Sequence, residues 1–479
     1  MDQLQTPLFD ALEKFNKLTK VSYHVPGHKN GQVFLKRGSE LYNSVLSVDA
    51  TELTGLDDLH APEGPIFEAE ALLADLYHAK KSYFLVNGST VGNLAMILAT
   101  CTDGDTVIVQ RNCHKSILHG LMLANVKPVF ITPSYEEKWG IASGIDAKVV
   151  RDALTLYPET KAIILTYPNY YGFAGDLSEI VTLAHERDIP LLVDEAHGAH
   201  FILGDSFPNS ALTFGADLVV QSAHKTLPAM TMGSYLHANS SLIDVQKVEF
   251  YLQMLQSSSP SYPIMGSLDL ARAYLASYTK IDQQLLMKKI ALFKESLATI
   301  QEIELLAPSA QFNADPLKVT IQSKKGISGF ELQSLLEEKG IYTELADARN
   351  VLFVLPLLKK DADYPFRQTV DLIENAVKGQ VGSNIEFPID KNSNKITALS
   401  MSYAKMKQTI TKQVSFYEAI GKISSEMVIP YPPGIPLIMA GELITEDKIN
   451  SLMNLLALHG HFHGGTFLKE GKLIVYHES

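Results

Sequence analysis

The sequence predicts an α/β fold whose largest domain contains a doubly wound, mainly parallel sheet. From Ser82 onward, short apolar runs typical of buried strands alternate regularly with segments of helical periodicity. Strands and helices that alternate in this way form parallel sheets with right-handed crossover connections. Two of the apolar runs, which lie in the stretches 191–197 and 218–225, end directly at polar and charged residues. Because ligands bind at the carboxyl edge of such sheets, these two strand ends predict the position of a functional site.

Length and composition are those of a soluble globular protein with more than one domain. The chain has 479 residues, of which 46% are hydrophobic and 20% are charged. This length exceeds that of one typical domain, and the composition gives no sign of extended disorder. The net charge of -12 disfavours nucleic acid as a partner and is compatible with a cationic substrate.

The two cysteines and the N-terminal segment indicate a cytoplasmic protein. Cys101 and Cys113 cannot build a disulfide framework, so we expect reduced thiols. Residues 1–5 lack the basic region and apolar core of a signal peptide. No apolar run reaches the length that spans a membrane, and we expect no membrane partner.

The spacing of apolar residues places the elements of the N-terminal half. Helical spacing within residues 1–20 predicts a short helix, and a Val-Pro-Gly-His turn follows at 25–28. Asp176 and Glu179 fit a capping-box-like start of a further helix. In chain order, we expect helices at 66–76, 91–101, 115–124 and 176–187, and strands at 82–86, 106–110, 128–132 and 162–166. Two further strands are expected to end within the stretches 191–197 and 218–225.

The C-terminal half predicts a long connector and a second, smaller α/β domain. Residues 267–297 have the pattern of one long helix. Strands at 318–321 and 351–355 flank a helix at 329–339, which predicts the smaller domain. The polar stretch 388–394 is expected to be a linker.

Asp194 and Lys225, which follow the two strand ends, suggest pyridoxal phosphate (PLP) as cofactor. This cofactor requires an amine that forms a Schiff base with its aldehyde, a carboxylate beside its pyridinium nitrogen, and an anion site for its phosphate. Lys225 would supply the amine and Asp194 the carboxylate. The carboxylate keeps the ring nitrogen protonated, so that the ring accepts the electron pair left at Cα when a bond there breaks.

The phosphate site is expected where the strand at 82–86 turns into the next helix. Gly88, Ser89 and Thr90 form a turn of small residues at this junction. Exposed N–H groups and the positive end of the helix dipole bind anions there. Ser222 and His224, beside the lysine, are the second set of expected phosphate contacts.

Each of these features also has a simpler explanation. An acid at a strand end is more often an ordinary turn or cap, and an isolated Ser-x-His-Lys is a weak signal. Residues 194–197, Asp-Glu-Ala-His, also spell the metal-binding box of a helicase. A helicase requires an upstream Gly-x-x-x-x-Gly-Lys-Ser/Thr loop, which this sequence lacks, so the helicase hypothesis is rejected.

Six motifs in order resemble the Orn/Lys/Arg decarboxylase family. This resemblance covers nearly the whole chain and implies PLP enzymes of the aspartate-aminotransferase fold, which is fold type I. The motifs are His-Val-Pro-Gly-His-Lys-x-Gly at 24–31, Leu-Asp-Asp-Leu-His at 56–60, Asn-Gly-Ser-Thr at 87–90, Arg-Asn-x-His-Lys-Ser at 111–116, Asp-Glu-Ala-His at 194–197 and Ser-x-His-Lys at 222–225.

The resemblance also implies a domain organisation and an assembly. We expect a short form that lacks the N-terminal wing domain of larger relatives, and a homodimer or dimer of dimers with active sites at the subunit interface. The expected domains are an N-terminal arm at 1–30, a PLP-binding large domain at 31–275, a small α/β domain at 276–385, and a C-terminal α+β domain of the decarboxylase family at 386–479.

By the same resemblance, His114 stacks on the PLP ring and holds it against Ala196 on the other face. Without the family, His114 would be a helix-capping or surface histidine. Protonated His197 and His224 are candidate acids that return a proton to Cα, beside Lys225. In the family, a hydroxyl-rich loop contacts the phosphate of the neighbouring subunit, and Ser258 is our choice among its three serines.

Glu344 is expected to face the distal cation of the substrate, with Asp347 as a second candidate. The simpler explanation is a solvated pair of acids at a strand end, and a buried acid would require a cationic partner. We expect no metal site. His459, His461 and His463 alternate on one strand face, but no carboxylate or cysteine pattern accompanies them.

The resemblance implies decarboxylation of a basic L-amino acid, lysine or arginine rather than ornithine, to the amine and CO2. The same fold and the same Asp-Lys pair also serve aminotransferases and lyases. An aminotransferase would require an arginine for the substrate carboxylate, and Arg349 is the nearest candidate. A non-catalytic PLP-fold protein that binds a partner is the alternative from another class.

Overall fold

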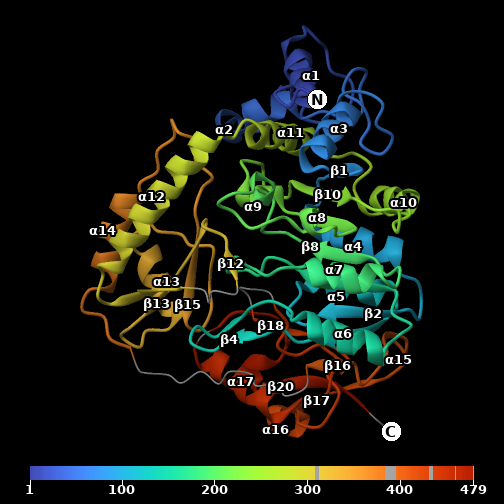
Figure 1. The fold of residues 1–479 in the computed structure, drawn as a ribbon. Coiled ribbons are helices and arrows are strands. Elements are labelled where there is room, and N and C mark those ends of the chain that lie inside the picture. Colours follow the sequence, from blue (N-terminus) through green and yellow to red (C-terminus); the bar gives the residue numbers. More distant parts are fainter. Residues whose placement is uncertain (308–311, 383–394, 431–434, 459, 478–479) are drawn as a thin grey trace. The chain divides into compact units, whose positions relative to one another are not determined.

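The structure is a computed structural model that describes residues 1–307, 312–382, 395–430, 435–458 and 460–477. Figure 1 shows the helices and strands, coloured along the sequence. The chain divides into two compact units. Unit 1 comprises residues 1–100, 190–204 and 209–279, and unit 2 comprises residues 101–189, 205–208 and 280–479.

Unit 1 contains four hydrogen-bonded strands in the order β1-β10-β9-β8. The last two are parallel, whereas β10 is antiparallel to both of its neighbours. The three strands predicted in this unit are confirmed, and β10 is an additional strand that the sequence pattern did not indicate. The bounds are β1 (Lys81–Leu85), β8 (Leu191–Asp194), β9 (Leu218–Gln221) and β10 (Ser234–Ala238).

Helix α4 follows β1 directly and packs closely against the sheet of unit 1. A Cβ atom on Gly92 would lie 2.7 Å from Leu85 Cδ1 and 2.9 Å from Val220 Cγ1, so only glycine permits this approach. The helices of unit 1 are α1 (Pro7–Lys17), α2 (Lys36–Val48), α3 (Pro65–Tyr77), α4 (Gly88–Thr100), η1 (Phe201–Leu203), α8 (Ala211–Phe214), α9 (Ala223–Thr226), α10 (Val245–Leu255) and α11 (Tyr262–Ala276).

Strand β1 lies at the edge of the sheet of unit 1, and side chains take the place of a further strand there. The N–H of Phe84 donates to Glu70 Oε1 over 2.8 Å, and the N–H of Val86 donates to Gln256 Oε1 over 2.9 Å. Burial raises the pKa of Glu70 to about 8, against the opposing effect of the hydrogen bond from Phe84. These contacts close an edge that would otherwise expose unpaired backbone groups.

In unit 2, strands β6, β2, β3 and β16 are hydrogen-bonded in this order. Strand β2 is parallel to both neighbours, and β16 is antiparallel to β3. The three strands predicted here are confirmed. The bounds are β2 (Thr106–Gln110), β3 (Lys127–Ile131), β6 (Ala162–Thr166), β16 (Ile396–Ala398), α5 (Lys115–Leu123), α6 (Ala147–Leu156) and α7 (Ser178–His185).

The predicted capping box at Asp176 is wrong. Helix α7 begins at Ser178, and Asp176 Oδ1 accepts a hydrogen bond from the Ser178 N–H over 2.7 Å. Glu179 forms an ion pair with Arg151 instead of reaching back to the start of the helix. The acid and the glutamate therefore act separately, because the helix starts one residue later than the expected motif requires.

The prediction of one long helix over residues 267–297 is also wrong. Helix α11 ends at Ala276, and α12 (Lys280–Ala298) begins after three further residues. The Ser277 hydroxyl donates to the carbonyl oxygens of Ala273 and Tyr274 over 2.8 and 2.9 Å, which satisfies the last carbonyls of α11. Side-chain hydrogen bonds of this kind compete with helix continuation, and apolar periodicity does not reveal them.

The smaller sheet predicted after residue 300 is present in unit 2, with antiparallel strands in the order β11-β13-β15-β14. The predicted helix beside it is also confirmed. The bounds are β11 (Ile303–Leu305), β13 (Lys318–Ser323), β14 (Leu345–Ala346), β15 (Asn350–Val354), α13 (Gly329–Glu337) and α14 (Phe366–Val377), and four two-residue strands lie elsewhere in the unit: β4 (Tyr135–Glu136), β5 (Ile141–Ala142), β7 (Phe173–Ala174) and β12 (Asn313–Ala314).

The C-terminal part of unit 2 has a core of its own and an α+β architecture. Strands β17 and β20 are antiparallel, as are β18 and β19, and apolar side chains of α16 and α17 pack against them. The predicted linker at 388–394 lies outside the described residues. The bounds are α15 (Tyr403–Met406), β17 (Thr411–Ser415), α16 (Phe416–Ala419), β18 (Val428–Pro430), α17 (Glu446–Ala457), β19 (Phe462–Gly464), η2 (Leu468–Glu470) and β20 (Lys472–Tyr476).

Candidate active site

Asp194 ends strand β8 and is only 3% exposed. Its Oδ2 atom accepts a hydrogen bond from the Asn93 side chain of α4 over 2.9 Å. Its Oδ1 atom is buried and has no hydrogen-bond partner among the described residues. Burial raises the pKa of Asp194, while the Lys225 charge and the Asn93 hydrogen bond act in the opposite direction. A buried acceptor of this kind requires a donor, and a ligand can supply one.

Lys225 lies in the short helix α9, which follows β9 directly. Its Nζ atom is 3.2 Å from Nε2 of His197, a buried side chain just after β8. The Lys225 charge also acts on Asp194. The ends of two neighbouring parallel strands therefore bring an acid, an amine and an imidazole together, as the carboxyl edge of such a sheet allows.

The predicted phosphate turn is the first turn of α4, because this helix begins at Gly88 and not at Val91. Ser222 is fully buried, and its Oγ donates to Ser89 Oγ over 2.8 Å. The two expected sets of phosphate contacts thus meet within unit 1. Helix α4 has 13 residues, so the N–H groups of Ser89 and Thr90 lie at the positive end of a substantial dipole.

The remaining predicted residues of unit 1 have local partners of their own. His224 lies beside the lysine, with Nδ1 2.9 Å from the Gly233 carbonyl oxygen. Ala196 is half-buried directly after the two acids. Ser258 is exposed in the loop between α10 and α11, where the preceding Ser257 carbonyl oxygen lies 2.8 Å from His60 Nε2. Their contacts with a cofactor stay predictions.

Glu195 and the adjacent Asp194 have different hydrogen-bond partners. It is fully buried and accepts hydrogen bonds from Ser210 Oγ, the Ala211 N–H and Gln221 Nε2. Three donors satisfy this carboxylate inside unit 1, whereas one oxygen of Asp194 has none. Glu195 therefore anchors the start of α8 to β9, and Asp194 presents an acceptor to a ligand.

His114 is the N-cap of α5 in unit 2. Its Nδ1 atom accepts from the Ser116 N–H over 3.2 Å and lies 2.8 Å from Ser116 Oγ. The helix-capping interpretation, which the sequence alone favoured, is thus confirmed as a local role. The capping contact uses one ring nitrogen, and stacking of His114 on the cofactor stays a prediction.

An ion pair that the sequence did not reveal holds the loop before His114. Arg111 Nη2 lies 3.0 Å from the Glu442 carboxylate, and Lys448 Nζ lies 2.7 Å from Glu442 Oε1. All three side chains are largely buried. The buried ion pair between Arg111 and Glu442 therefore fixes this loop to the C-terminal part of unit 2. A signal was present in the sequence, because Arg111 opens the fourth family motif.

Glu344 and Asp347 have different surroundings in unit 2. Glu344 is exposed and lines a cavity of about 410 Å³ together with Tyr342 and Phe366. Asp347 accepts hydrogen bonds from the Tyr171 hydroxyl and from the backbone and side chain of Asn350. Hydrogen bonds within unit 2 thus hold Asp347, whereas Glu344 lines a cavity, and a contact of either acid with the substrate stays a prediction.

Of the three histidines considered for a metal, His463 has a neighbouring cation in place of a metal ligand set. Its Nδ1 atom lies 3.1 Å from Lys115 Nζ. His459 lies outside the described residues. The described part of the chain contains no group of three or more His, Cys, Asp or Glu side chains that could hold a metal ion. Within the same residues, no helix is both long and apolar enough to cross a membrane.

Comparison with known proteins shows the family to which this chain belongs. The major-domain model of the Orn/Lys/Arg decarboxylases matches residues 6–312, and the C-terminal-domain model of these enzymes matches residues 389–464. An arginine decarboxylase of Bacillus anthracis is 34% identical over 465 residues, which cover 94% of this chain and 92% of the relative. The chain belongs to the Orn/Lys/Arg decarboxylase family.

Two further relatives of this decarboxylase cover almost its whole length. The uncharacterized protein YaaO of Bacillus subtilis is 47% identical over 481 residues, which cover 99% of each chain. The crystal structure of the lysine decarboxylase of Francisella novicida has a TM-score of 0.81 and 20% sequence identity, and it covers 99% of this chain and 81% of that chain. The second likeness establishes the fold, which is that of fold type I PLP enzymes.

The residues present in unit 1 fit PLP, the cofactor of this family. The buried Oδ1 of Asp194 is an acceptor that a protonated ring nitrogen would satisfy. Lys225 would supply the amine, and the first turn of α4 with Ser222 would supply an anion site. The decarboxylase is therefore PLP-dependent, and when bound, the cofactor supplies the electron sink for decarboxylation of a basic amino acid.

Proposed function

We propose that this decarboxylase acts on L-arginine, releasing CO2 and forming agmatine, with L-lysine as the second candidate. The support is the 34% identity with an arginine decarboxylase over more than nine tenths of both chains. The lysine decarboxylase with the same fold is only 20% identical. Both substrates carry a distal cation, so the difference between them depends on side-chain length and hydrogen bonding rather than on charge.

Lys225 and His197 are proposed to handle the proton at Cα. Lys225 would hold the cofactor through its Nζ in the resting enzyme, and with substrate bound the same Nζ would be available to carry a proton. The 3.2 Å separation from His197 Nε2 allows a proton to pass between the two groups. Loss of CO2 leaves an electron pair at Cα, and the proton returned from this pair of side chains completes the amine.

Asp194 and the phosphate turn are proposed to orient the cofactor. The charge of Asp194 stabilises the protonated ring nitrogen, and Asn93 fixes the carboxylate through Oδ2. Gly88, Ser89, Thr90, Ser222 and His224 hold the phosphate, and Ala196 and His114 enclose the ring. In the proposed homodimer, Ser258 contacts the phosphate of the partner subunit.

The substrate is identified by kcat/KM measured separately with L-arginine, L-lysine and L-ornithine, with the amine product identified by mass spectrometry. We expect the highest kcat/KM with arginine, and agmatine as the product. A higher value with lysine, with cadaverine as product, would transfer the assignment to the second candidate.

Glu344 is proposed to bind the distal cation of the substrate. Glu344→Gln removes one charge-assisted hydrogen bond, which contributes about 1.5–3 kcal/mol. We therefore expect KM for the preferred substrate to rise roughly tenfold or more, with a small change in kcat. Steady-state kinetics measures both constants.

The control is Glu337→Gln, which removes the same charge from an exposed position on α13. This variant should retain the wild-type KM. Equal KM values in the two variants would show that Glu344 does not contact the substrate.

A further inference from the structure

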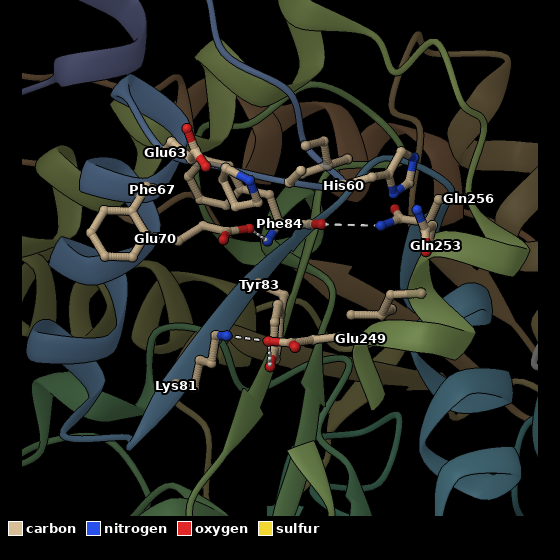
Figure 2. Close-up of a pocket in the computed structure, with 14 residues that line it drawn as sticks. His60, Glu63, Phe67, Glu70, Lys81, Tyr83, Phe84, Glu249, Gln253 and Gln256 are labelled. Carbon is tan, nitrogen blue, oxygen red and sulfur yellow. Dashed lines mark hydrogen bonds and ion pairs between the residues drawn. The ribbon is translucent and has the colours of Figure 1, made fainter. Parts of the chain in front are cut away.

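A cavity of about 340 Å³ in unit 1 lies between α3, β1 and α10. Two polar side chains that line this cavity, Glu70 of α3 and Gln256 at the end of α10, form hydrogen bonds with the backbone of Phe84, as Figure 2 shows. Of these two side chains, Gln256 also binds the backbone of Val86, which lies two residues before the phosphate turn at 88–90. Neither side chain has a role in the chemistry proposed above.

Gln256 uses its amide as a substitute for a neighbouring strand. Oε1 accepts from the Val86 N–H over 2.9 Å, and Nε2 donates to the Phe84 carbonyl oxygen over 3.4 Å. Gln256 is only 7% exposed, so these bonds form away from water. An amide supplies both a donor and an acceptor, which neither a carboxylate nor an aliphatic side chain can do.

Gln256 also ends helix α10 and begins the hydroxyl-rich loop. Its own N–H donates to the Leu252 carbonyl oxygen, and the next residue, Ser257, presents its carbonyl oxygen to His60 at 2.8 Å. The backbone of the loop is thus fixed on both sides of this position. One buried side chain therefore connects the start of the loop at 257–259 to the end of β1.

We propose that Gln256 is a positioning residue that fixes the position of two phosphate-binding segments relative to each other. The turn at 88–90 binds the phosphate of its own subunit, and the loop at 257–259 reaches the phosphate of the partner subunit. This inference rests on the proposed function for both segments. It follows that each Gln256 supports cofactor binding at two active sites of the dimer, one in its own subunit and one in its partner.

The test is the affinity for PLP of Gln256→Leu, which keeps the approximate volume and removes both hydrogen bonds. The buried Val86 N–H then has no partner, and the first turn of α4 loses its fixed position. We expect the Kd for PLP to rise roughly tenfold or more. The visible circular dichroism of the bound cofactor should change as well, because the ring is held in a different orientation.

Gln253→Leu is the matched control, because Gln253 lies one turn earlier on α10 and lines the same cavity. Gln253 is exposed, and its side chain forms no hydrogen bond with the described residues. Its Kd should equal that of the wild type. If Gln256→Leu does not fold, Gln256→Glu retains the acceptor for Val86 and lacks the donor for Phe84, and it should bind PLP with an intermediate Kd.

A mixed dimer tests the link between the subunits. One subunit keeps the native sequence, and its partner carries both Lys225→Ala and Gln256→Leu, so that only the native subunit can bind PLP covalently. We expect weaker PLP binding at this native Lys225 than in a mixed dimer whose partner carries Lys225→Ala alone.

The outcomes separate this inference from the proposed function. If the wild-type protein does not bind PLP, the function assigned to the site is wrong. If the wild type binds PLP and Gln256→Leu binds equally well, only the role of Gln256 is wrong. Weaker binding in the Gln256→Leu homodimer with no loss in the mixed dimer would overturn the link between subunits.

Discussion

Replacement of Lys225 by alanine is expected to lower the rate of amine formation by at least about three orders of magnitude. The variant loses both the amine that anchors the cofactor and the group that lies 3.2 Å from His197. It should also lose the visible colour that borohydride bleaches in the wild-type protein. The rate of amine release with PLP in excess measures the first effect, and an absorbance spectrum measures the second.

Lys247→Ala is the control for this experiment, because Lys247 is an exposed lysine on α10 of the same unit. It should retain full activity and colour. A rate for Lys225→Ala within tenfold of the wild type would show that another lysine holds the cofactor.

Asp194→Asn is expected to reduce kcat by roughly 100- to 1000-fold, the usual effect of removing one preorganised electrostatic group from an active site. Asparagine has nearly the same shape and can still accept a hydrogen bond through one oxygen. It carries no charge, however, and cannot stabilise a protonated ring nitrogen. The loss should therefore affect kcat more than the affinity for PLP, and single-turnover rates with saturated cofactor measure it.

The neighbouring acid, Glu195, provides the control for the Asp194→Asn substitution. Glu195→Gln changes a carboxylate of equal burial whose three hydrogen bonds remain within unit 1. We expect this substitution to lower the melting temperature, because an amide cannot accept well from all three donors, and to leave kcat per folded protein nearly unchanged. A similar fall of kcat in both variants would mean that Asp194 acts only by maintaining the fold.

The sequence predicted the strands well because a buried parallel strand is a continuous apolar run. Strands β2 and β6 have the predicted bounds, and β8 and β9 lie at the start of the two predicted stretches, 191–197 and 218–225. Strand β10 was missed because its sequence, Ser-Tyr-Leu-His-Ala, mixes polar and apolar residues although all five are buried. Its polar members are satisfied inside the sheet: His237 Nδ1 lies 2.8 Å from Ser82 Oγ.

The residues of the site were predictable where a reactive side chain lies at or just after the end of a strand in the sequence. Asp194 and Lys225 are of this kind, and the structure brings them together. Asn93 and Gln256 were not predictable, because their partners lie 101 and 170 residues away along the chain. Such positioning contacts depend on tertiary packing, which apolar periodicity does not encode.

The reaction itself is tested most directly by product analysis in deuterium oxide. Wild-type protein loaded with PLP is incubated with L-arginine, and the product is examined by mass spectrometry and proton NMR. If decarboxylation is followed by return of a proton at Cα, the product is agmatine with one solvent deuterium on the carbon that carried the carboxylate, together with CO2. A keto acid that retains the carboxylate would contradict this account and identify the protein as an aminotransferase on the same fold.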